Sequence, residues 1–130
     1  MNIAVLDDLP EDLHRLCELL ESVCAEHTPR PVIRAFTDDK KFLAYMSSVR
    51  ADIVFLDIYL GERTGIQTAQ ILRSFNANCA IIFVTTSREH AVEAFDVTAA
   101  HYLIKPVTEA GVREALSRTP FFKKDRPTIT

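Results

Sequence analysis

Hydrophobic and polar positions follow two different periods along the chain. Short runs that are almost wholly apolar predict buried strands, whereas longer segments with apolar residues three or four positions apart predict helices with one apolar face. Leu13, Leu16 and Leu20 show the second spacing. The two patterns take turns along the chain and predict strands at 2–6, 32–36, 52–56, 80–84 and 101–104, and helices at 10–26, 39–48, 66–75, 88–95 and 108–118.

This alternation predicts the class of fold. Strands that alternate with helices build a parallel sheet with helices on both of its faces. The handedness and length of the crossovers favour a doubly wound α/β domain, and we expect the flavodoxin-like strand order 2-1-3-4-5. The run at 80–84 is the most apolar and predicts the most buried strand, whereas 32–36 is expected near an edge.

Several predicted helices begin at residues suited to a helix start. Pro10 is compatible with a first helical position, and Thr37 or Asp38 can cap the helix at 39–48. Thr64 can cap the helix at 66–75 in the same way. In that helix we expect these apolar residues to face the core: Ile66, Ala69, Ile71, Leu72 and Phe75.

Length and composition indicate one ordinary globular domain. The 130 residues are 48% hydrophobic and 25% charged, and the net charge of −3 argues against a general nucleic-acid binder. No apolar run approaches the roughly 18 residues that a membrane span needs. The start of the chain, MNIAVLDD, lacks the pattern of a signal peptide, so we expect a cytoplasmic protein.

The cysteines agree with a reducing compartment. Cys17 and Cys24 are seven residues apart in a predicted helix, hence about 10 Å apart along its axis. That separation exceeds the roughly 7 Å between Cα atoms that a disulfide tolerates. Together with Cys79 they show no zinc-ligand spacing, and the pair is interpreted as small core residues.

Polar or charged residues stand where four of the predicted strands end. In a doubly wound sheet, sites form beyond the carboxyl ends of the strands, so these side chains are expected to meet. Each alone has an ordinary explanation, such as a helix cap, a turn or a solvated surface residue, but four matched positions indicate a site. The residues are Asp7 and Asp8 after the first strand, Asp57 after the third, Thr85 and Thr86 after the fourth, and Lys105 after the fifth.

The chemistry of this set favours phosphoryl transfer. Three carboxylates brought together repel one another, and a divalent cation relieves the conflict. Mg²⁺ suits such a site because it binds carboxylates, keeps waters and accepts phosphate oxygens. With Thr85 as a hydroxyl donor and Lys105 as a positive charge, Asp57 is a candidate nucleophile for attack on phosphorus.

These motifs resemble the receiver domain of two-component response regulators. The matching features span residues 2–118 and consist of the acid pair at 7–8, Asp57 after a hydrophobic strand, Gly65 eight residues later, Thr85 after IIFV, and KP at 105–106. The stretch AVEAFDVTAAHYLIKP is also similar to receivers attached to LytTR-type DNA-binding domains. The expected domain covers 1–118, and 119–130 is interpreted as a linker towards an effector domain.

The resemblance implies a role for each residue of the motif. Asp57 would accept a phosphoryl group from a sensor histidine kinase, and Thr85, Thr86 and Lys105 would surround its oxygens. The Lys105–Pro106 peptide would be cis, and Tyr102 would be the aromatic residue that responds with Thr85 to phosphorylation. Homodimerisation on activation and DNA binding through a C-terminal domain are the implied outputs. The implied ligands of Mg²⁺ are Asp7, Asp8, Asp57 and the backbone carbonyl of Tyr59.

Three other interpretations are weighed against a phosphorylated receiver. A phosphatase of the aspartate-nucleophile kind would carry a second acid two residues after Asp57, where this chain has Tyr59. A degenerate receiver that acts only as a protein-interaction module is favoured by the bulk of Thr86, a position that is usually very small in the family, but disfavoured by the intact Thr85 and Lys105. A flavin-binding module of the same fold would need a phosphate-cradling loop after the first strand, which the sequence lacks.

Overall fold

The predicted alternation of strands and helices is present throughout the described part of the chain. The computed structural model describes residues 1–60, 63–76 and 78–122. The strands are β1 (Asn2–Leu6), β2 (Val32–Phe36), β3 (Ile53–Asp57), β4 (Ala80–Thr85) and β5 (His101–Ile104). The helices are α1 (Pro10–Cys24), α2 (Asp39–Ser48), α3 (Gly65–Phe75), α4 (Ala91–Asp96) and α5 (Glu109–Ser117), followed by a short 3₁₀ helix, η1 (Pro120–Phe122).

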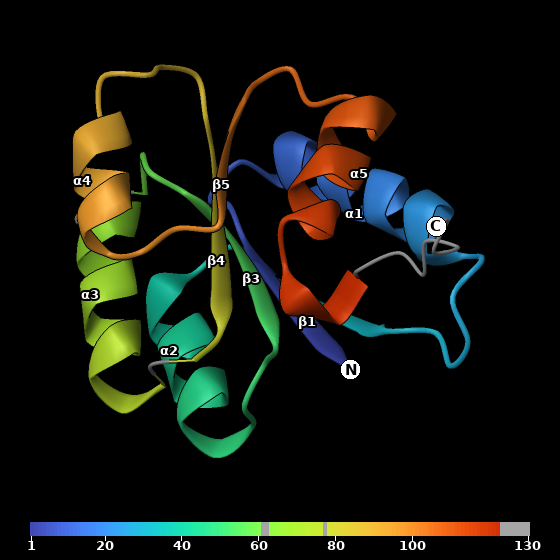
Figure 1. Cartoon of the computed structure of the whole chain (residues 1–130). Coiled ribbons are helices and arrows are strands. Elements are labelled where there is room, and N and C mark those ends of the chain that lie inside the picture. Colours follow the sequence, from blue (N-terminus) through green and yellow to red (C-terminus); the bar gives the residue numbers. More distant parts are fainter. Residues whose placement is uncertain (61–62, 77, 123–130) are drawn as a thin grey trace, which may run out of the picture.

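The five strands form one parallel sheet in the order β2-β1-β3-β4-β5, which confirms the predicted fold and strand order. Helices α1 and α5 cover one face of this sheet, and α2, α3 and α4 cover the other (Figure 1). The strands start near the N-terminus at the bottom of Figure 1 and run upwards, so their carboxyl ends share the upper rim.

The alternation of side chains along each strand divides the apolar core into two layers. In β1, Ile3 and Val5 pack on the side of α1 and α5, whereas Ala4 and Leu6 pack on the side of α2 and α3. Every residue of β3 and β4 is buried, as expected for central strands covered on both faces. Strand β2 lies at an edge and is more exposed, in agreement with its sequence pattern.

Local hydrogen bonds explain where the helices begin. Pro10 occupies the start of α1, and the Asp38 carboxylate accepts the backbone N–H of Lys40 at 3.0 Å at the start of α2. At α3, the Thr64 hydroxyl accepts the N–H of Gln67 at 3.1 Å, and the Gln67 amide oxygen accepts the N–H of Thr64 at 2.9 Å. This reciprocal pair is a capping box that fixes the first turn of α3.

Two details of the predicted helices were wrong. Ile71 and Phe75 were expected to face the core, but each is 37% exposed. The inward stripe of α3 is formed by Ile66, Ala69 and Leu72. Measured from Leu72, Ile71 is rotated by about 100° and Phe75, three residues later, by about 60°, and both rotations lead away from Ala69. Helix α4 begins at Ala91, three residues later than predicted.

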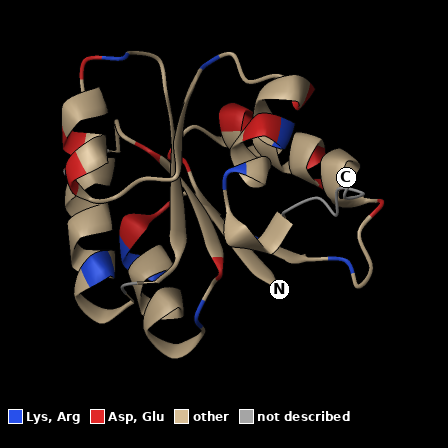
Figure 2. Ribbon diagram, in the orientation of Figure 1, with Lys and Arg blue, Asp and Glu red and all other residues tan. Residues whose placement is uncertain are grey.

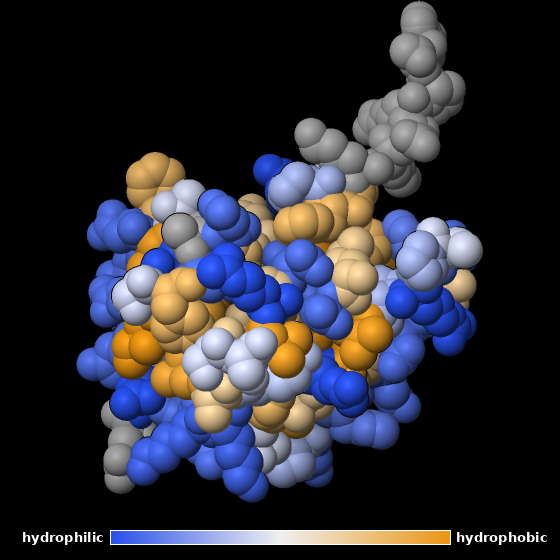
Figure 3. Space-filling view, turned by 90° about the horizontal axis from the view of Figure 1, so that it is seen from below, coloured by the Kyte–Doolittle hydropathy of each residue, from blue (hydrophilic) through white to orange (hydrophobic). Residues whose placement is uncertain are grey.

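The surface has no strong separation of charge. Acidic and basic residues occur in both helical layers (Figure 2), in keeping with the modest net charge. The lower face, where the strands begin, mixes hydrophilic and hydrophobic side chains (Figure 3). Over the residues that the structure describes, none of the helices combines the length and apolar character needed to cross a membrane.

Part of the predicted linker packs against the domain. Thr119 is buried, and the buried ring of Phe122 contacts the ring of His27 with centroids 4.3 Å apart. Phe122 also joins the core on the side of α1 and α5. The rest of the predicted linker, 123–130, lies outside the described residues.

Candidate functional site

The residues predicted at the strand ends lie on the same rim of the sheet. Asp57 and Thr85 are the last residues of β3 and β4, one position further into the sheet than the sequence predicted. Asp7 directly follows β1, and Lys105 directly follows β5. The parallel register therefore places groups from four strands at one edge, because every strand runs in the same direction.

The two buried carboxylates are oriented by their own loops. Asp57 is 4% exposed, and its Oδ1 accepts the backbone N–H of Tyr59 at 3.1 Å. Asp7 is buried as well, and its Oδ1 accepts the N–H of Leu9 at 3.0 Å. In both residues one oxygen is held by the backbone two positions ahead, which leaves Oδ2 directed at the shared site.

The ammonium group of Lys105 connects the acids. Its Nζ lies 2.9 Å from Asp7 Oδ2, 3.0 Å from Asp57 Oδ2 and 2.8 Å from Asp12 Oδ2. The Lys105–Pro106 peptide bond is cis. Asp12, on the first turn of α1, was not predicted, because a helix residue that reaches a lysine 93 positions away leaves no pattern in the sequence.

Burial and charge act against each other at these groups. Burial raises the pKa of Asp57, the hydrogen bond from Lys105 lowers it and the neighbouring Asp7 raises it, with a net pKa of about 6. Burial by itself lowers the pKa of Lys105, but hydrogen bonds to the three carboxylates outweigh this and raise the pKa above its ordinary value. Burial is the largest cause, and together with the neighbouring charge of Asp7 it explains why Asp57 holds its proton to a higher pH despite the hydrogen bond from Lys105.

This balance predicts how the stability of the metal-free protein depends on pH. Asp57 titrates at about 6 in the folded state and, like other unfolded aspartates, at about 4 when unfolded. Its contribution to stability is fully present below about pH 4 and is lost as pH rises through about 6. We expect wild type to lose about 1 to 3 kcal/mol relative to Asp57→Asn between pH 4 and pH 7.5. Urea unfolding of both proteins in EDTA measures this difference, and parallel pH profiles would contradict it.

The acids fit a small, hard cation. Asp7, Asp8 and Asp57 each offer one carboxylate oxygen, and the three oxygens lie within 4.8 Å of one another. Asp7 and Asp57 are buried, whereas Asp8 is more exposed. A site made of carboxylate oxygens, open to water on one side and carrying excess negative charge, has the ligand chemistry that Mg²⁺ prefers.

Gly65 holds the loop after Asp57 close to the helix that follows. Its backbone N–H donates to the carbonyl of Ile58 at 2.7 Å. A Cβ at Gly65 would lie 2.0 Å from the carbonyl oxygen of Asp57 and 2.8 Å from the Cα of Ile58. Only glycine permits this approach, so the motif glycine eight residues after Asp57 fixes the path of the chain that carries the acid.

The remaining predicted residues, Thr85, Thr86 and Tyr102, differ in how far they are exposed to solvent. Thr85 is fully buried, and its hydroxyl has no hydrogen-bond partner among the described residues. Thr86, the next residue, is exposed. The hydroxyl of Tyr102 donates to the backbone carbonyl of Ser87 at 2.7 Å, which attaches β5 to the loop after β4.

Tyr59 flanks the site on the other side. Its backbone N–H donates to Asp57, and its ring lies edge-on to His90 with centroids 5.6 Å apart. His90 in turn contacts the carboxylate of Glu93 at 2.9 Å. The loop after β3 and the start of α4 are thus in contact beside Asp57.

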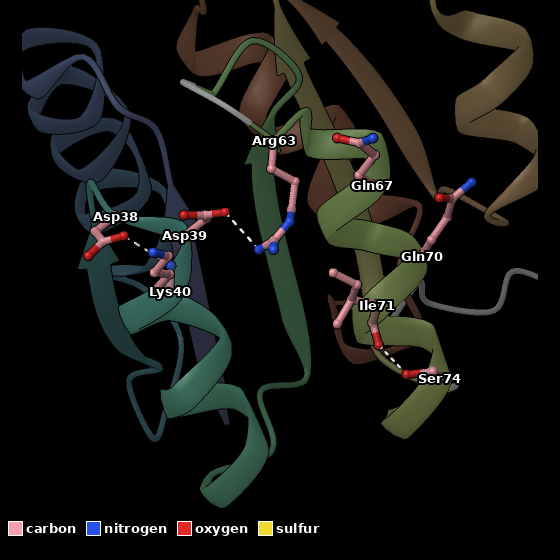
Figure 4. A pocket seen from close by; sticks show the side chains of 8 residues that line it. All are labelled: Asp38, Asp39, Lys40, Arg63, Gln67, Gln70, Ile71 and Ser74. Atoms are coloured by element: carbon pink, nitrogen blue, oxygen red, sulfur yellow. Dashed lines mark hydrogen bonds and ion pairs between the residues drawn. The ribbon is translucent and has the colours of Figure 1, made fainter.

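Two surface hollows differ in what lines them. A hollow of about 300 Å³ adjoins the acids and is lined by residues that include Asp7, Asp12, Thr86 and Lys105. A larger one, about 890 Å³, lies between α2 and α3, where Arg63 pairs with Asp39 at 2.8 Å (Figure 4). None of the predicted site residues lines the larger hollow, whereas Asp7, Thr86 and Lys105 line the smaller one, which therefore adjoins the candidate site.

The fold and this acidic site, with its lysine, define a signalling domain of the response-regulator class. The model of the response regulator receiver domain family matches residues 3–117. The chain belongs to this family, which confirms the resemblance seen in the sequence.

Individual relatives agree with the family. The chain is 35% identical over 118 residues to the positive alginate biosynthesis regulatory protein of Pseudomonas aeruginosa, covering 91% of this chain and 46% of that protein. It is 33% identical over 93 residues to the transcriptional regulatory protein YpdB of Escherichia coli, covering 72% of this chain and 38% of the relative. The chain therefore spans less than half the length of these relatives.

Solved structures share the fold over nearly the whole chain. The response regulatory domain of protein mrkE from Klebsiella pneumoniae is 26% identical, with a TM-score of 0.77 over 93% of this chain and 96% of that one. The chemotaxis protein CheY4 of Vibrio cholerae is 22% identical, with a TM-score of 0.77 over 91% of this chain and 97% of that one. The second likeness supports the fold alone.

Proposed function

We propose that this domain is a phosphoacceptor receiver in which Asp57 takes a phosphoryl group from a sensor histidine kinase. The observation that carries the proposal is the buried Asp57 carboxylate, whose Oδ2 lies 3.0 Å from the Lys105 ammonium within a cluster of acids. A carboxylate held next to a cation and beside metal-binding groups is arranged for in-line displacement at phosphorus.

The proposed step transfers one phosphoryl group between two nucleophiles. An oxygen of Asp57 forms a new P–O bond while the P–N bond to the kinase histidine breaks. The electron pair of the broken bond stays on the imidazole, which is protonated from water. Lys105 is within reach of the oxygens of the new acyl phosphate and compensates part of their charge.

Mg²⁺ would be held by Asp7, Asp8 and Asp57, and the backbone carbonyl of Tyr59 is proposed as a further ligand. When bound, it would neutralise the carboxylates and bind a phosphoryl oxygen. The protein's own contribution is position: the backbone N–H groups of Leu9 and Tyr59 hold Asp7 and Asp57 in place before any ligand arrives.

Thr85 and Tyr102 are proposed to convert phosphorylation into a change of surface. The buried hydroxyl of Thr85, which has no partner within residues 1–60, 63–76 and 78–122, gains one if it turns towards a phosphoryl oxygen. Space behind Thr85 would then favour an inward position of Tyr102, at the cost of its hydrogen bond to Ser87. The domain would thus populate two conformations that differ in the surface around the β4–α4 loop and β5, and phosphorylation would shift the balance between them.

The outputs follow from the relatives and remain proposals for this chain. YpdB is described as a transcriptional regulatory protein, and it is longer than the part that matches this chain. We propose control of transcription through a C-terminal DNA-binding domain of the LytTR type, with homodimerisation on activation and a cytoplasmic location. The proposed linker towards that domain lies within 119–130.

Incubation with acetyl phosphate tests the proposed function. With Mg²⁺ we expect a mass gain of one phosphoryl group, and no gain in EDTA. Borohydride reduction followed by peptide mass spectrometry is expected to locate the acyl phosphate at Asp57. Turnover of acetyl phosphate without an adduct would favour a phosphatase, and the absence of both would favour a phosphorylation-independent interaction module.

Replacement of Thr85 by valine separates stability from phosphoryl binding. Thr85→Val removes a buried hydroxyl that has no partner among the described residues, so we expect a gain of about 1 kcal/mol in unfolding free energy. The affinity for beryllofluoride, a phosphoryl mimic, is expected to fall by about tenfold, as for the loss of one hydrogen bond to a charged group. Unfolding in urea and fluoride-dependent titration measure the two effects.

Thr68→Val provides a matched control. Thr68 is also fully buried, and its hydroxyl likewise has no partner in the described part of the chain, but it lies in α3 rather than at the site. We expect the same gain in stability and unchanged beryllofluoride binding. Equal loss of binding in both variants would contradict the role proposed for Thr85.

A further inference from the structure

Asp12 makes the shortest of the three contacts to Lys105, yet it belongs to a different element from the other acids. Its Oδ2 lies 2.8 Å from Nζ, and its side chain is 40% exposed on the first turn of α1. Asp7 and Asp57 are buried in the rim of the sheet. Lys105 is therefore held from both sides, by the sheet and by a helix.

Three carboxylates contact the Lys105 ammonium group, and it donates hydrogen bonds to two of them, Asp12 and Asp57. An ammonium group has three N–H donors, and three carboxylates lie within 3.0 Å of Nζ. A phosphoryl oxygen that binds this group therefore competes with the carboxylates that already contact it. The three acids that can share a cation include Asp7 and Asp57 but not Asp12. A cation would thus weaken the first two contacts of Lys105 and leave the contact with Asp12 in place.

Asp12 also faces the hollow that adjoins Lys105. It lines the hollow of about 300 Å³ together with Asp7, Thr86 and Lys105. An anionic phosphodonor that approaches Lys105 through this hollow meets the carboxylate of Asp12. Like charges brought this close oppose binding, and the effect is strongest where solvent is partly excluded.

We propose that Asp12 is a positioning residue that competes with phosphoryl oxygens for Lys105 and so sets how tightly the domain binds a phosphoryl group. This inference rests on the proposed phosphoacceptor function and adds a specific determinant to it. The residue acts through Lys105 and does not itself touch the phosphoryl group. Replacing its charge is therefore expected to strengthen binding, the opposite of what loss of a phosphoryl ligand would do.

The test compares Asp12→Asn with Glu11→Gln. Both substitutions remove one negative charge from the first turn of α1, but Glu11 is exposed and makes no contact with Lys105 in the described structure. In saturating Mg²⁺ we expect Asp12→Asn to bind beryllofluoride about threefold to tenfold more tightly than wild type does, because the substitution removes one negative charge at short range from Lys105. Glu11→Gln is expected to match wild type. Asp12→Glu, which keeps the charge, is expected to return the affinity towards the wild-type value.

Binding of Mg²⁺ alone supplies a readout that a merely structural role would not reproduce. Asp12→Asn is expected to leave Mg²⁺ affinity unchanged or lower while beryllofluoride affinity rises, whereas a disturbed fold would weaken both. Asp12→Ala serves as a second variant if the asparagine distorts the helix. Unchanged or weaker beryllofluoride binding in both variants, with wild type binding normally, overturns this inference alone. Failure of wild type to bind beryllofluoride or take up a phosphoryl group overturns the proposed function and this inference with it.

Discussion

Asp57→Asn is expected to abolish Mg²⁺-dependent uptake of a phosphoryl group while the domain stays folded. An amide has no anionic oxygen with which to attack phosphorus, and the nearby carboxylates are not equivalent substitutes. One carboxylate oxygen of Asp7 accepts a hydrogen bond from its own loop, and the other contacts Lys105. Asp12 lies on a helix and does not belong to the three described acids that can share a cation. We expect uptake to fall more than about 100-fold, as for removal of a covalent nucleophile.

The measurement is intact mass after incubation with acetyl phosphate and Mg²⁺, with thermal unfolding to show that the variant is folded. The fold is expected to persist because Lys105 keeps two of its three carboxylate partners. Asp39→Asn is a suitable control, since Asp39 pairs with Arg63 in the hollow between α2 and α3. An adduct of equal yield in Asp57→Asn would place the acceptor elsewhere.

Gly65→Ala is expected to destabilise the domain strongly, even though it adds a single methyl group. That methyl would lie 2.0 Å from the backbone oxygen of Asp57, and backbone atoms of a fully buried strand cannot move aside cheaply. The expected loss is about 2 to 4 kcal/mol of unfolding free energy, at the upper end of overpacking effects. Because the strain falls on Asp57 and Ile58, phosphoryl uptake should fall even in the molecules that remain folded.

Gly111→Ala is the matched comparison for this prediction. A Cβ at Gly111 would meet Thr108 Oγ1 at 3.3 Å and Leu103 Cδ2 at 3.4 Å, and both are side-chain atoms at longer distances than the backbone atoms that a Cβ at Gly65 would meet. Alanine also favours the helix by about 1 kcal/mol, so the net change is expected to stay within about 1 kcal/mol. Urea unfolding compares the two variants, and similar losses in both would refute the special role of Gly65.

The elements of the fold were predictable because each one has its own local signal. The apolar runs of β3 and β4 and the cap at Thr64 depend on residues close together in the sequence. The group of residues at the rim of the sheet was predictable for a different reason. Parallel strands end at the same edge, so the convergence of Asp57 and Lys105 can be predicted without knowing how their side chains are oriented.

Features that depend on three-dimensional side-chain reach were not predictable. The contact between Asp12 and Lys105 joins a helix to a loop 93 residues away, and the sequence of α1 shows Asp12 only as a first-turn acid. Ile71 and Phe75 are apolar and follow other apolar residues at nearly helical spacing, so the sequence pattern did not show that they lie outside the buried face of α3. That the Thr85 hydroxyl has no partner among the residues that the structure describes is likewise evident only when its surroundings are known.

The position of Lys105 in the chain has a consequence for how the domain assembles. Its acidic partners come from β1, α1 and β3, all within the first half of the sequence, whereas the lysine follows the last strand. Without β5 in its place in the sheet, these carboxylates would lack the ammonium that offsets them. Closure of this long loop is therefore the step that relieves their repulsion, and an intact lysine–carboxylate cluster is a sign that the sheet has been completed to its final edge.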